Sequence, residues 1–370
     1  MTQIVRGLSE VFSFVHLMTP AGDIRVSKGQ DPTSIKSSFE RSSANPYRNY
    51  ARFGKLRRKY AKARLVMHRE KYAAVLGVDP EGLCHAFAMN KHIRKPLVYA
   101  SFELLFQNEV FSDQEKNLKD KELRASREVA LVLVQDELRE RLLRENCEFT
   151  KASFCHCPVA PWPERLRKSD FLRRELGIPA GKRIVLVAGH LHPFSSRDLL
   201  HEMVSHWRDP YHLVVHSRFD LTKRERMFLE RLCYSTGRVS ITQGSVALGN
   251  LTEIFCSADF ALLPYCPEPS HWMSYQNIYN IGMSSGKAAY AAMCGLPMIA
   301  SALPTYSQLF DEVKCGAVYS RVGEIPNLLD LLDSNYSFHS REARRFYDEL
   351  LNPTEGIARF CQEVVKLANQ

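Results

Sequence analysis

The stretch Asn277–Ser301 reads NIYNIGMSSGKAAYAAMCGLPMIAS and contains a complete loop, helix and strand. A polar loop with Gly282 leads into small and apolar residues, which predict a helix over Ser285–Met293. The apolar run Pro297–Ala300 predicts a short buried strand. A helix followed by a short buried strand is the repeating unit of a parallel α/β sheet.

The same alternation precedes this stretch from residue 168 onwards. Strands are predicted at Arg183–Ala188, Tyr211–His216, Val239–Gln243 and Phe260–Tyr265, and helices at Lys168–Gly177, Ser196–Trp207, Thr222–Cys233 and Leu251–Ala258. Short apolar strands separated by helices indicate a doubly wound parallel sheet.

A second run of this kind occupies the first half of the chain. Strands are predicted at Tyr72–Gly77, Pro96–Ser101, Ala130–Val134 and Phe149–Cys155, a turn at Val78–Gly82, and helices at Leu83–Asn90, Ser112–Glu128 and Asp136–Arg144. We therefore expect an α/β protein with two Rossmann-like doubly wound parallel sheets that face a cleft. Ligands bind such sheets beyond the carboxyl ends of the strands, so the cleft is the default site.

The length of 370 residues favours two domains. Pro158, Pro161 and Pro163 interrupt the pattern and mark a linker. We expect domains at residues 1–160 and 161–350, and a C-terminal helix over 351–370 that could cross back to the first domain. Residues 1–50 are poorly defined: 21–50 have the composition of a loop, and Val11–Met18 is the one plausible strand.

Several classes of protein are excluded by composition. The chain has no run of about 18 apolar residues, which predicts no membrane-spanning helix, and its start is a poor signal peptide. The ten scattered cysteines fit free thiols in a reducing cytoplasm. Cys155-His156-Cys157 lacks further ligands at a suitable spacing, so no metal site is expected.

The net charge of +9 is concentrated in residues 51–71, which hold nine Lys or Arg and one acid, Glu70. Apolar residues recur there every three or four positions and predict a helix with a basic remainder. This face could be solvated, or residues 52–71 could contact an anionic membrane. Nucleic acid is not an expected partner, since no zinc finger or RNA-binding motif accompanies the charge.

The helix beginning after Ser285 has the features of an anion site. Amide groups at a helix start point outward unpaired, and the helix dipole favours negative charge there. Ser284 or Ser285 can cap the helix or donate to a phosphate oxygen. Lys287 in the first turn opposes the dipole, and a bound anion would offset that cost. A capped helix with a solvated lysine is the alternative.

Six segments, in order, resemble family-four GT-B glycosyltransferases (glycosyltransferase group 1) over about residues 70–365. They are Val78–Leu83, Val98–Leu104, Leu133–Asp136, Gly189–Leu191 with Arg197, Ser257–Pro264, and Ser285–Lys287 with Gly295–Ile299. Some positions depart from the family pattern. Gly282 and Tyr290 stand where the family has paired glutamates, His190 where it has arginine, and Phe102 where it has histidine. The first strand and glycine-rich turn of the N-terminal domain are not recognisable, which suggests a shortened domain.

The resemblance implies a retaining, hexosyltransferase-like enzyme of bacterial-type polysaccharide or glycoconjugate synthesis, which transfers sugar from a nucleoside diphosphate sugar to an acceptor hydroxyl. No Asp-x-Asp motif is present, which agrees with a metal-independent site without a further cofactor. The expected catalytic residues are Lys287, Arg197 and Glu103. The expected donor-binding residues are Gly189, His190, Gly282, Ser284, Ser285, Gly286 and Tyr290. Asp79 and Glu81 are expected on the acceptor side.

The acceptor would be a saccharide or a lipid-linked sugar, and the protein would be cytoplasmic or peripheral on the inner face of the membrane. Two alternatives remain open at this point. The chain could be an inactive GT-B scaffold that binds a partner or membrane, or a sugar-nucleotide epimerase on the same fold.

Overall fold

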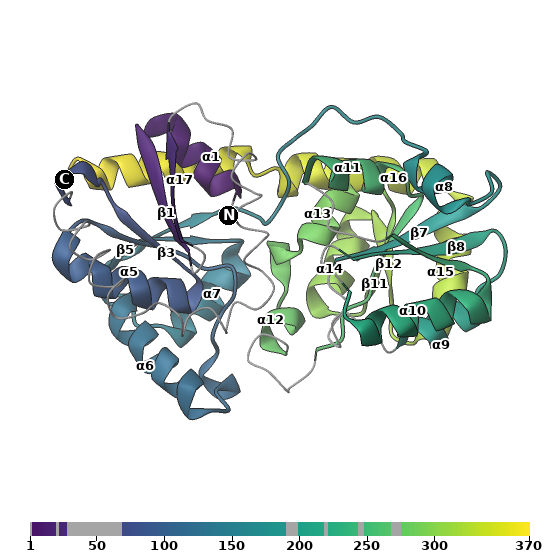
Figure 1. Ribbon diagram of the computed structural model, residues 1–370, viewed down its shortest axis with the longest axis horizontal. Coiled ribbons are helices and arrows are strands. Elements are labelled where there is room, and N and C mark those ends of the chain that lie inside the picture. Colours follow the sequence, from purple (N-terminus) through teal and green to yellow (C-terminus); the bar gives the residue numbers. More distant parts are fainter. Residues whose placement is uncertain are drawn as a thin grey trace. The chain divides into compact units, whose positions relative to one another are not determined.

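The structure, a computed structural model, describes residues 2–19, 22–27, 69–189, 199–217, 221–242, 248–267 and 275–370. The chain forms two compact units, Met1–Cys157 with Pro353–Gln370, and Pro158–Asn352 (Figure 1). We call them unit 1 and unit 2 and describe each by itself.

Unit 2 contains a parallel sheet of six described strands in the order β12-β11-β10-β7-β8-β9. The strands are β7 (Arg183–Ala188), β8 (Tyr211–His216), β9 (Val239–Thr242), β10 (Phe260–Leu263), β11 (Met298–Ser301) and β12 (Gly316–Tyr319). The chain runs outward from β7 to β9 and then returns to β10 on the other side of β7. The strand order therefore reverses between β7 and β10, and such a reversal leaves a crevice at the carboxyl ends of the two strands.

Helices cover both faces of this sheet. One face packs against α9 (Leu200–Ser205), α10 (Lys223–Thr236) and α15 (Ile325–Ser334). The other packs against α8 (Phe171–Leu176), α11 (Leu248–Cys256), α13 (Gly286–Met293), α14 (Pro304–Val313), α16 (Tyr336–Phe346) and the π-helix η8 (Tyr347–Leu351). Short helices α12 (Gln276–Tyr279), η6 (Gly282–Ser284) and η7 (Val322–Glu324) complete the described part of the unit.

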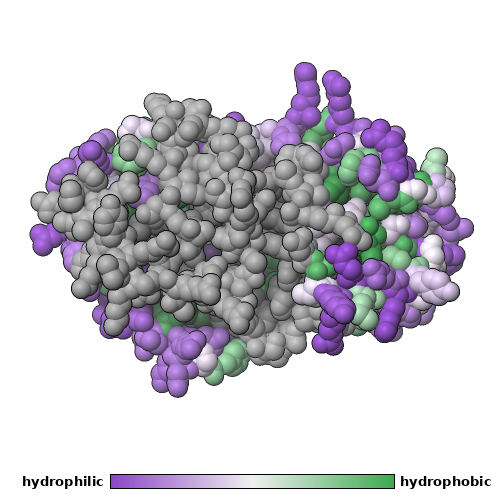
Figure 2. Space-filling view, viewed as in Figure 1, coloured by the Kyte–Doolittle hydropathy of each residue, from purple (hydrophilic) through white to green (hydrophobic). Residues whose placement is uncertain are grey.

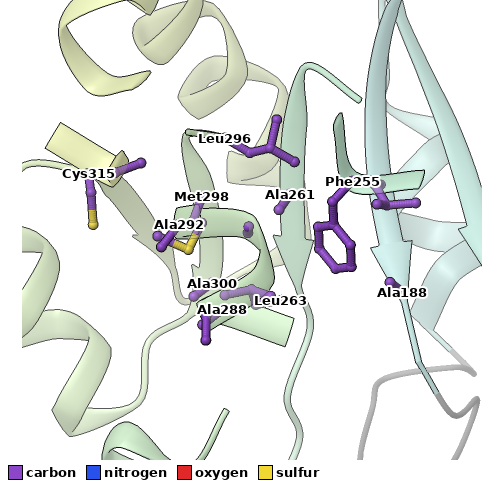
Figure 3. Close-up of a cluster of buried hydrophobic side chains, with 14 of the residues drawn as sticks. Ala188, Phe255, Ala261, Leu263, Ala288, Ala292, Leu296, Met298, Ala300 and Cys315 are labelled. Atoms are coloured by element: carbon purple, nitrogen blue, oxygen red, sulfur yellow. The ribbon is translucent and has the colours of Figure 1, made fainter. Parts of the chain in front are cut away.

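Small side chains bring α13 close to the sheet. Ala288 and Ala292 of this helix lie among the buried strand residues Leu263, Met298 and Ala300 (Figure 3). Alanine lets the helix backbone approach the strands more closely than a large side chain would. The packing therefore fixes the start of α13 against the carboxyl ends of the central strands.

Unit 1 has a parallel sheet of four described strands in sequence order, β3 (Val75–Val78), β4 (Leu97–Ala100), β5 (Val129–Val134) and β6 (Ser153–His156). Helices α5 (Asp79–Ile93), α6 (Asp113–Ser126) and α7 (Glu137–Asn146) contribute to one core with these strands, and η2 (Arg69–Lys71) and η3 (Gln107–Glu109) are short helical turns. The C-terminal helix α17 (Thr354–Ala368) contacts β5 and β6 and also packs on α1 (Thr2–Val11).

The expectations for the N-terminal residues are wrong in two places. Val11–Met18 is not one strand, because α1 extends through Val11 and strand β1 covers Phe14–Thr19. The segment expected to be a loop contains strand β2 (Gly22–Ser27), which pairs antiparallel with β1. Ile4, Val5 and Leu8 of α1 are buried, so tertiary packing on α17 stabilises a helix too short to be conspicuous in the sequence.

Two further boundaries are corrected. The turn expected at Val78–Gly82 is the first turn of α5, which begins at Asp79. Pro80 lies in that first turn, where a missing backbone N–H costs nothing. The strand expected at Phe149–Cys155 begins later, at Ser153, and ends at His156.

No helix among the described residues is long and apolar enough to cross a membrane. On the face drawn in Figure 2, hydrophilic side chains predominate among the coloured residues, with hydrophobic ones between them. The basic helix expected at 52–71 lies outside the described residues except for Arg69–Lys71, which form η2.

Candidate functional site

The strand reversal in unit 2 places two loop starts side by side. β7 is followed by Gly189, whose φ of +119° favours glycine, and β10 is followed by Pro264 and Tyr265. The two strands pair directly, so their carboxyl ends form one edge. We call this place the switch point.

The start of α13 is fixed at the switch point by hydrogen bonds. The Ser285 hydroxyl caps the helix by accepting the backbone N–H of Ala288 at 3.2 Å. The same oxygen lies 2.7 Å from the hydroxyl of Tyr265, which is buried. A residue that follows β10 therefore holds the N-cap of α13.

Lys287 extends from the first turn of α13 to the same place. Its ammonium lies 5.1 Å above the centroid of the Tyr265 ring. A Cβ at Gly189 would come within 2.6 Å of Lys287 Cε and 3.3 Å of its Nζ, so the end of the lysine side chain lies directly against this glycine. Lys287 and Gly189, which are 98 positions apart, are thus in contact.

The Lys287 charge has no counter-charge among the described residues, because no salt bridge found there includes it. Burial lowers the pKa of Lys287 from 10.5 to about 8. A cation that is shielded from water and has no acidic partner is costly, whereas a buried charge at the other edge of this sheet is paired. Asp259, for example, receives hydrogen bonds from Arg173 and from the backbone of Ile184.

The other residues expected to bind the donor lie in different surroundings. Gly282 is buried with a φ of +52°, Ser284 ends the short helix η6, and Gly286 opens α13. The Tyr290 ring stacks on Phe255 of α11 at 5.4 Å, so its ring packs against the core of the unit. His190 and Arg197 lie outside the described residues.

The sequence did not point to His216, which ends β8 beside the switch point. Its carbonyl accepts the backbone N–H of Gly189, and its Nδ1 lies 2.5 Å from the Thr242 hydroxyl. Its Nε2 is buried and has no hydrogen-bond partner among the residues that the structure describes, and burial lowers the pKa of this imidazole to about 4. Only its place at a strand end could have signalled it.

A second polar group lies at the carboxyl edge of the sheet in unit 1. Asp79 Oδ1 accepts the backbone N–H groups of Phe102 and Glu103 at 2.8 and 3.0 Å. Burial raises the pKa of Asp79 to about 6, while the two backbone hydrogen bonds oppose that rise. Glu81 lies in the first turn of α5, and its charge raises the pKa of Asp79 further.

Glu103 and Arg139 belong to the same group. Burial raises the pKa of Glu103 to about 7, and Arg139 opposes this shift. Arg139 is 1% exposed, and its guanidinium donates to the Phe102 carbonyl at 2.6 Å. The sequence predicted Asp79 and Glu103 at this edge but gave no signal for Arg139, which is one of many charged residues in α7.

Metal ligation is not indicated by the described side chains. Across the described ranges, no three His, Cys, Asp or Glu side chains are grouped as a metal site requires. His156, from the Cys-His-Cys segment, instead pairs with Glu140 at 2.7 Å.

Comparison with known proteins identifies the fold. No family model matches the sequence, and no curated protein matches it. Among solved structures, HepE of Anabaena in complex with UDP-glucose is similar with a TM-score of 0.63 and 14% identity, covering 82% of this chain and 81% of that one. Sucrose-phosphate synthase of Thermosynechococcus elongatus gives 0.63 and 16%, covering 84% and 77%.

A third similar structure is WaaG, a glycosyltransferase involved in lipopolysaccharide biosynthesis, with a TM-score of 0.56, 14% identity and coverage of 84% and 96%. The chain therefore has the α/β fold of the GT-B glycosyltransferases, with parallel sheets of four and six described strands. At these identities the likeness concerns the fold, so function must be argued from the site.

Proposed function

We propose that the chain is a glycosyltransferase that takes its sugar from a nucleoside diphosphate sugar and holds the diphosphate at the switch point of unit 2. The observation that carries this proposal is Lys287. Its half-buried side chain has no acidic partner in the described residues and touches the glycine that follows β7. A bound diphosphate would supply the missing negative charge.

The chemistry of sugar transfer fits this arrangement. When the bond from the anomeric carbon to the diphosphate breaks, negative charge grows on the leaving phosphate. Cations and amide dipoles aimed at that charge stabilise the transition state. Lys287 and the backbone amides around Ser284–Gly286 supply them here, and the proposal keeps Arg197 and His190 as further contacts to the diphosphate.

The remaining assignments are part of the same proposal. Unit 2 binds the donor and unit 1 the acceptor, with Asp79 and Glu81 on the acceptor side. Transfer is retaining, independent of metal, and serves polysaccharide or glycoconjugate synthesis. The acceptor is a saccharide or lipid-linked sugar, and residues 52–71 contact an anionic membrane on its cytoplasmic face. Gly282 and Tyr290 line the donor site.

Calorimetry and thermal shift with UDP-glucose, GDP-mannose and UDP test the donor assignment. UDP-glucose is the first choice because HepE was solved with it. We expect one nucleotide to raise the melting temperature, and Lys287→Ala to weaken its binding about 10- to 100-fold, as expected for a hydrogen bond to a charged group.

Lys223→Ala is the matched control. Lys223 also lies in the first turn of a helix in unit 2, but its side chain is exposed. Binding should be unchanged in this variant. If no nucleotide shifts the melting temperature of the native chain, the donor proposal is wrong and a GT-B scaffold without donor chemistry is the better description.

A further inference from the structure

Two cysteine side chains meet on one face of the sheet in unit 2. Cys256 is the last residue of α11, and Cys294 directly follows α13. The two helices lie next to each other on this face (Figure 1). The sulfur atoms of Cys256 and Cys294 are 3.5 Å apart, within the hydrogen-bonding distance of thiols. Two thiols separated by 38 positions in the sequence are therefore in direct contact.

Neighbouring residues of both helices hold this contact in place. The ring of Phe255, which precedes Cys256, stacks on the ring of Tyr290 with their centroids 5.4 Å apart. The Cys294 sulfur also lies 3.9 Å from the carbonyl oxygen of Thr252, one turn before Cys256. Packing between α11 and α13 thus keeps the two sulfur atoms close together.

The surroundings make the two thiols unequal. The hydrogen bond with Cys294 lowers the pKa of Cys256, and the charge of Lys168 lowers it further, while burial and Glu164 oppose this shift. The pKa of Cys294 is raised by its hydrogen bond with Cys256 and by burial, which outweigh the opposite effect of Arg344. Cys256 therefore loses its proton first, and Cys294 donates its S–H to the resulting thiolate. The thiolate is the reactive form of cysteine.

Other cysteines of the chain have the surroundings of unreactive thiols. Burial raises the pKa of Cys84, Cys157 and Cys315 to about 12 in each case. Such thiols keep their protons at neutral pH and react slowly. Cys256 differs from them because a neighbouring thiol and a cation both favour its charged form.

The pair lies close to the surface of unit 2. Cys256 is 6% exposed, and Cys294 is half-buried. The ammonium of Lys168 lies 2.6 Å from the carbonyl oxygen of Ala258, two residues after Cys256, and its side chain is 61% exposed. A small oxidant therefore has only a short path from solvent to the two sulfur atoms.

We propose that Cys256 and Cys294 form a redox-active pair, which hydrogen peroxide converts to a disulfide. The Cys256 thiolate attacks one peroxide oxygen, the O–O bond breaks, and hydroxide leaves and takes up a proton to give water. Cys256 is then a sulfenic acid. The Cys294 sulfur attacks the Cys256 sulfur, the S–O bond breaks, and the hydroxyl leaves as water with the Cys294 proton. Two thiols are oxidised, one peroxide is reduced to two waters, and a dithiol reductant reverses the change.

The disulfide requires only a small movement. Its sulfur atoms are about 2 Å apart, so those of Cys256 and Cys294 must approach by about 1.5 Å. Cys294 lies beyond the end of α13, where a small change of the backbone breaks no helical turn. The closed loop contains Tyr265, Ser285 and Lys287, so oxidation links the two ends of the segment that carries them. Reversible disulfides of this kind serve as redox sensors in reducing compartments.

The first experiment treats the native chain, at low protein concentration, with hydrogen peroxide. The remaining thiols are alkylated, and the digested protein is analysed by mass spectrometry. We expect the peptides of Cys256 and Cys294 to be joined and to separate again after dithiothreitol. The exposed Cys266 is the internal control, because its oxidation shows that the peroxide was active. The oxidised chain should also melt several degrees above the reduced one.

The second experiment uses Cys294→Ala. Peroxide should leave Cys256 of this variant as a sulfenic acid, which dimedone traps, and should not raise the melting temperature. Alkylation of Cys256 at pH 7 should be severalfold slower than in the native chain, because its thiolate has lost a hydrogen bond. Cys233→Ala, at a half-buried cysteine of α10, is the matched control and should behave like the native chain.

The native chain alone can overturn the proposal. If Cys266 is oxidised and no link between Cys256 and Cys294 forms, the two residues are ordinary packed thiols. Equal alkylation rates of Cys256 in the native chain and in Cys294→Ala would show that Cys294 does not activate it. These measurements use no nucleotide, so their outcome is independent of the donor proposal.

Discussion

The two sheets differ in whether the charged side chains at their carboxyl edges have partners of opposite charge. In unit 1, the buried Arg139 cation lies with the carboxyl groups of Asp79 and Glu103, so that the positive charge is compensated within the protein. In unit 2, Lys287 stands at the switch point with no acidic partner among the described residues. The same topology, a parallel strand followed by a helix, thus produces one balanced edge and one unbalanced edge.

The difference teaches what each edge can bind. A buried charge without a partner costs stability, so its presence at a ligand-binding edge points to a ligand of opposite charge. Lys287 therefore points to an anion. The edge of unit 1 compensates its buried cation with its own carboxyl groups, so that cation does not point to a further anion. Four predictions test this contrast, in order of decreasing effect.

The largest effect is expected in the pH dependence of nucleotide binding. With a pKa of about 8, Lys287 is charged below pH 8 and loses its proton above it. UDP pairs with the charged form and raises its pKa, so its affinity should fall about tenfold per pH unit above 8, and about a hundredfold between pH 7 and 10. Calorimetry across this range measures it.

Lys287→Arg is the control for that profile, because a guanidinium stays charged throughout. Its affinity for UDP should be nearly independent of pH in the same interval. A native affinity that is equally flat between pH 7 and 10 would show that the Lys287 ammonium does not contact the phosphate groups.

The second prediction concerns stability without ligand. Because the folded pKa of Lys287 lies below its unfolded value, the charged lysine destabilises the fold below about pH 8, and this cost vanishes as the pH rises towards 10. Lys287→Met should therefore increase the free energy of unfolding at pH 7 by about 1–3 kcal/mol. Urea unfolding at pH 7 and pH 10 measures the difference. A loss of stability at pH 7 would instead give Lys287 a structural role.

The third prediction is the counterpart in unit 1. The folded pKa of Glu103, about 7, lies above its ordinary value of 4.5, so stability falls as the pH rises through this interval. Glu103→Gln removes that slope and should be more stable than the native chain at pH 8, by about 1–2 kcal/mol because the side chain is partly covered. Thermal unfolding of both proteins at several pH values from 5 to 8 tests this prediction. If the stability of the two proteins changes equally with pH, the prediction is wrong.

Much of the fold could be predicted because buried parallel strands are continuous apolar runs. Arg183–Ala188 and Tyr211–His216 were predicted with the bounds that β7 and β8 have, since every residue of such a strand is covered and flanking polar residues mark its ends. The helix α1 escaped notice because its stability comes from packing on α17, a distant segment that a local pattern does not contain. The strand β2 was missed although its partner β1 lies two residues before it, because the residues after it have the composition of a loop.

The site could be predicted only in part, for a related reason. Lys287 was conspicuous because a cation in the first turn of a helix violates a local rule. Its contact with Gly189 and the hydrogen bond between Tyr265 and Ser285 depend on the strand order, and so does the hydrogen bond of Arg139 to the Phe102 carbonyl. His216 carries no local signal, since a histidine at a strand end is ordinary until its unpaired Nε2 is seen.

The smallest effect is expected at the N-cap of α13. Ser285→Ala removes the cap on Ala288 and leaves the buried Tyr265 hydroxyl without this partner, which should cost about 1–2 kcal/mol of unfolding free energy. Thr222→Ala removes the equivalent cap of α10, where the side chain is exposed, and should cost about 1 kcal/mol or less.

Nucleotide affinity distinguishes these two caps better than stability does. If the switch point binds the diphosphate, loosening the first turn of α13 displaces both Lys287 and the amides beside it, so Ser285→Ala should weaken UDP binding several-fold. Thr222→Ala should leave that affinity unchanged, because α10 packs on the opposite face of the sheet. Equal affinities in the two variants would mean that the start of α13 is a capped helix end and that the unbalanced charge of Lys287 serves something other than a phosphate.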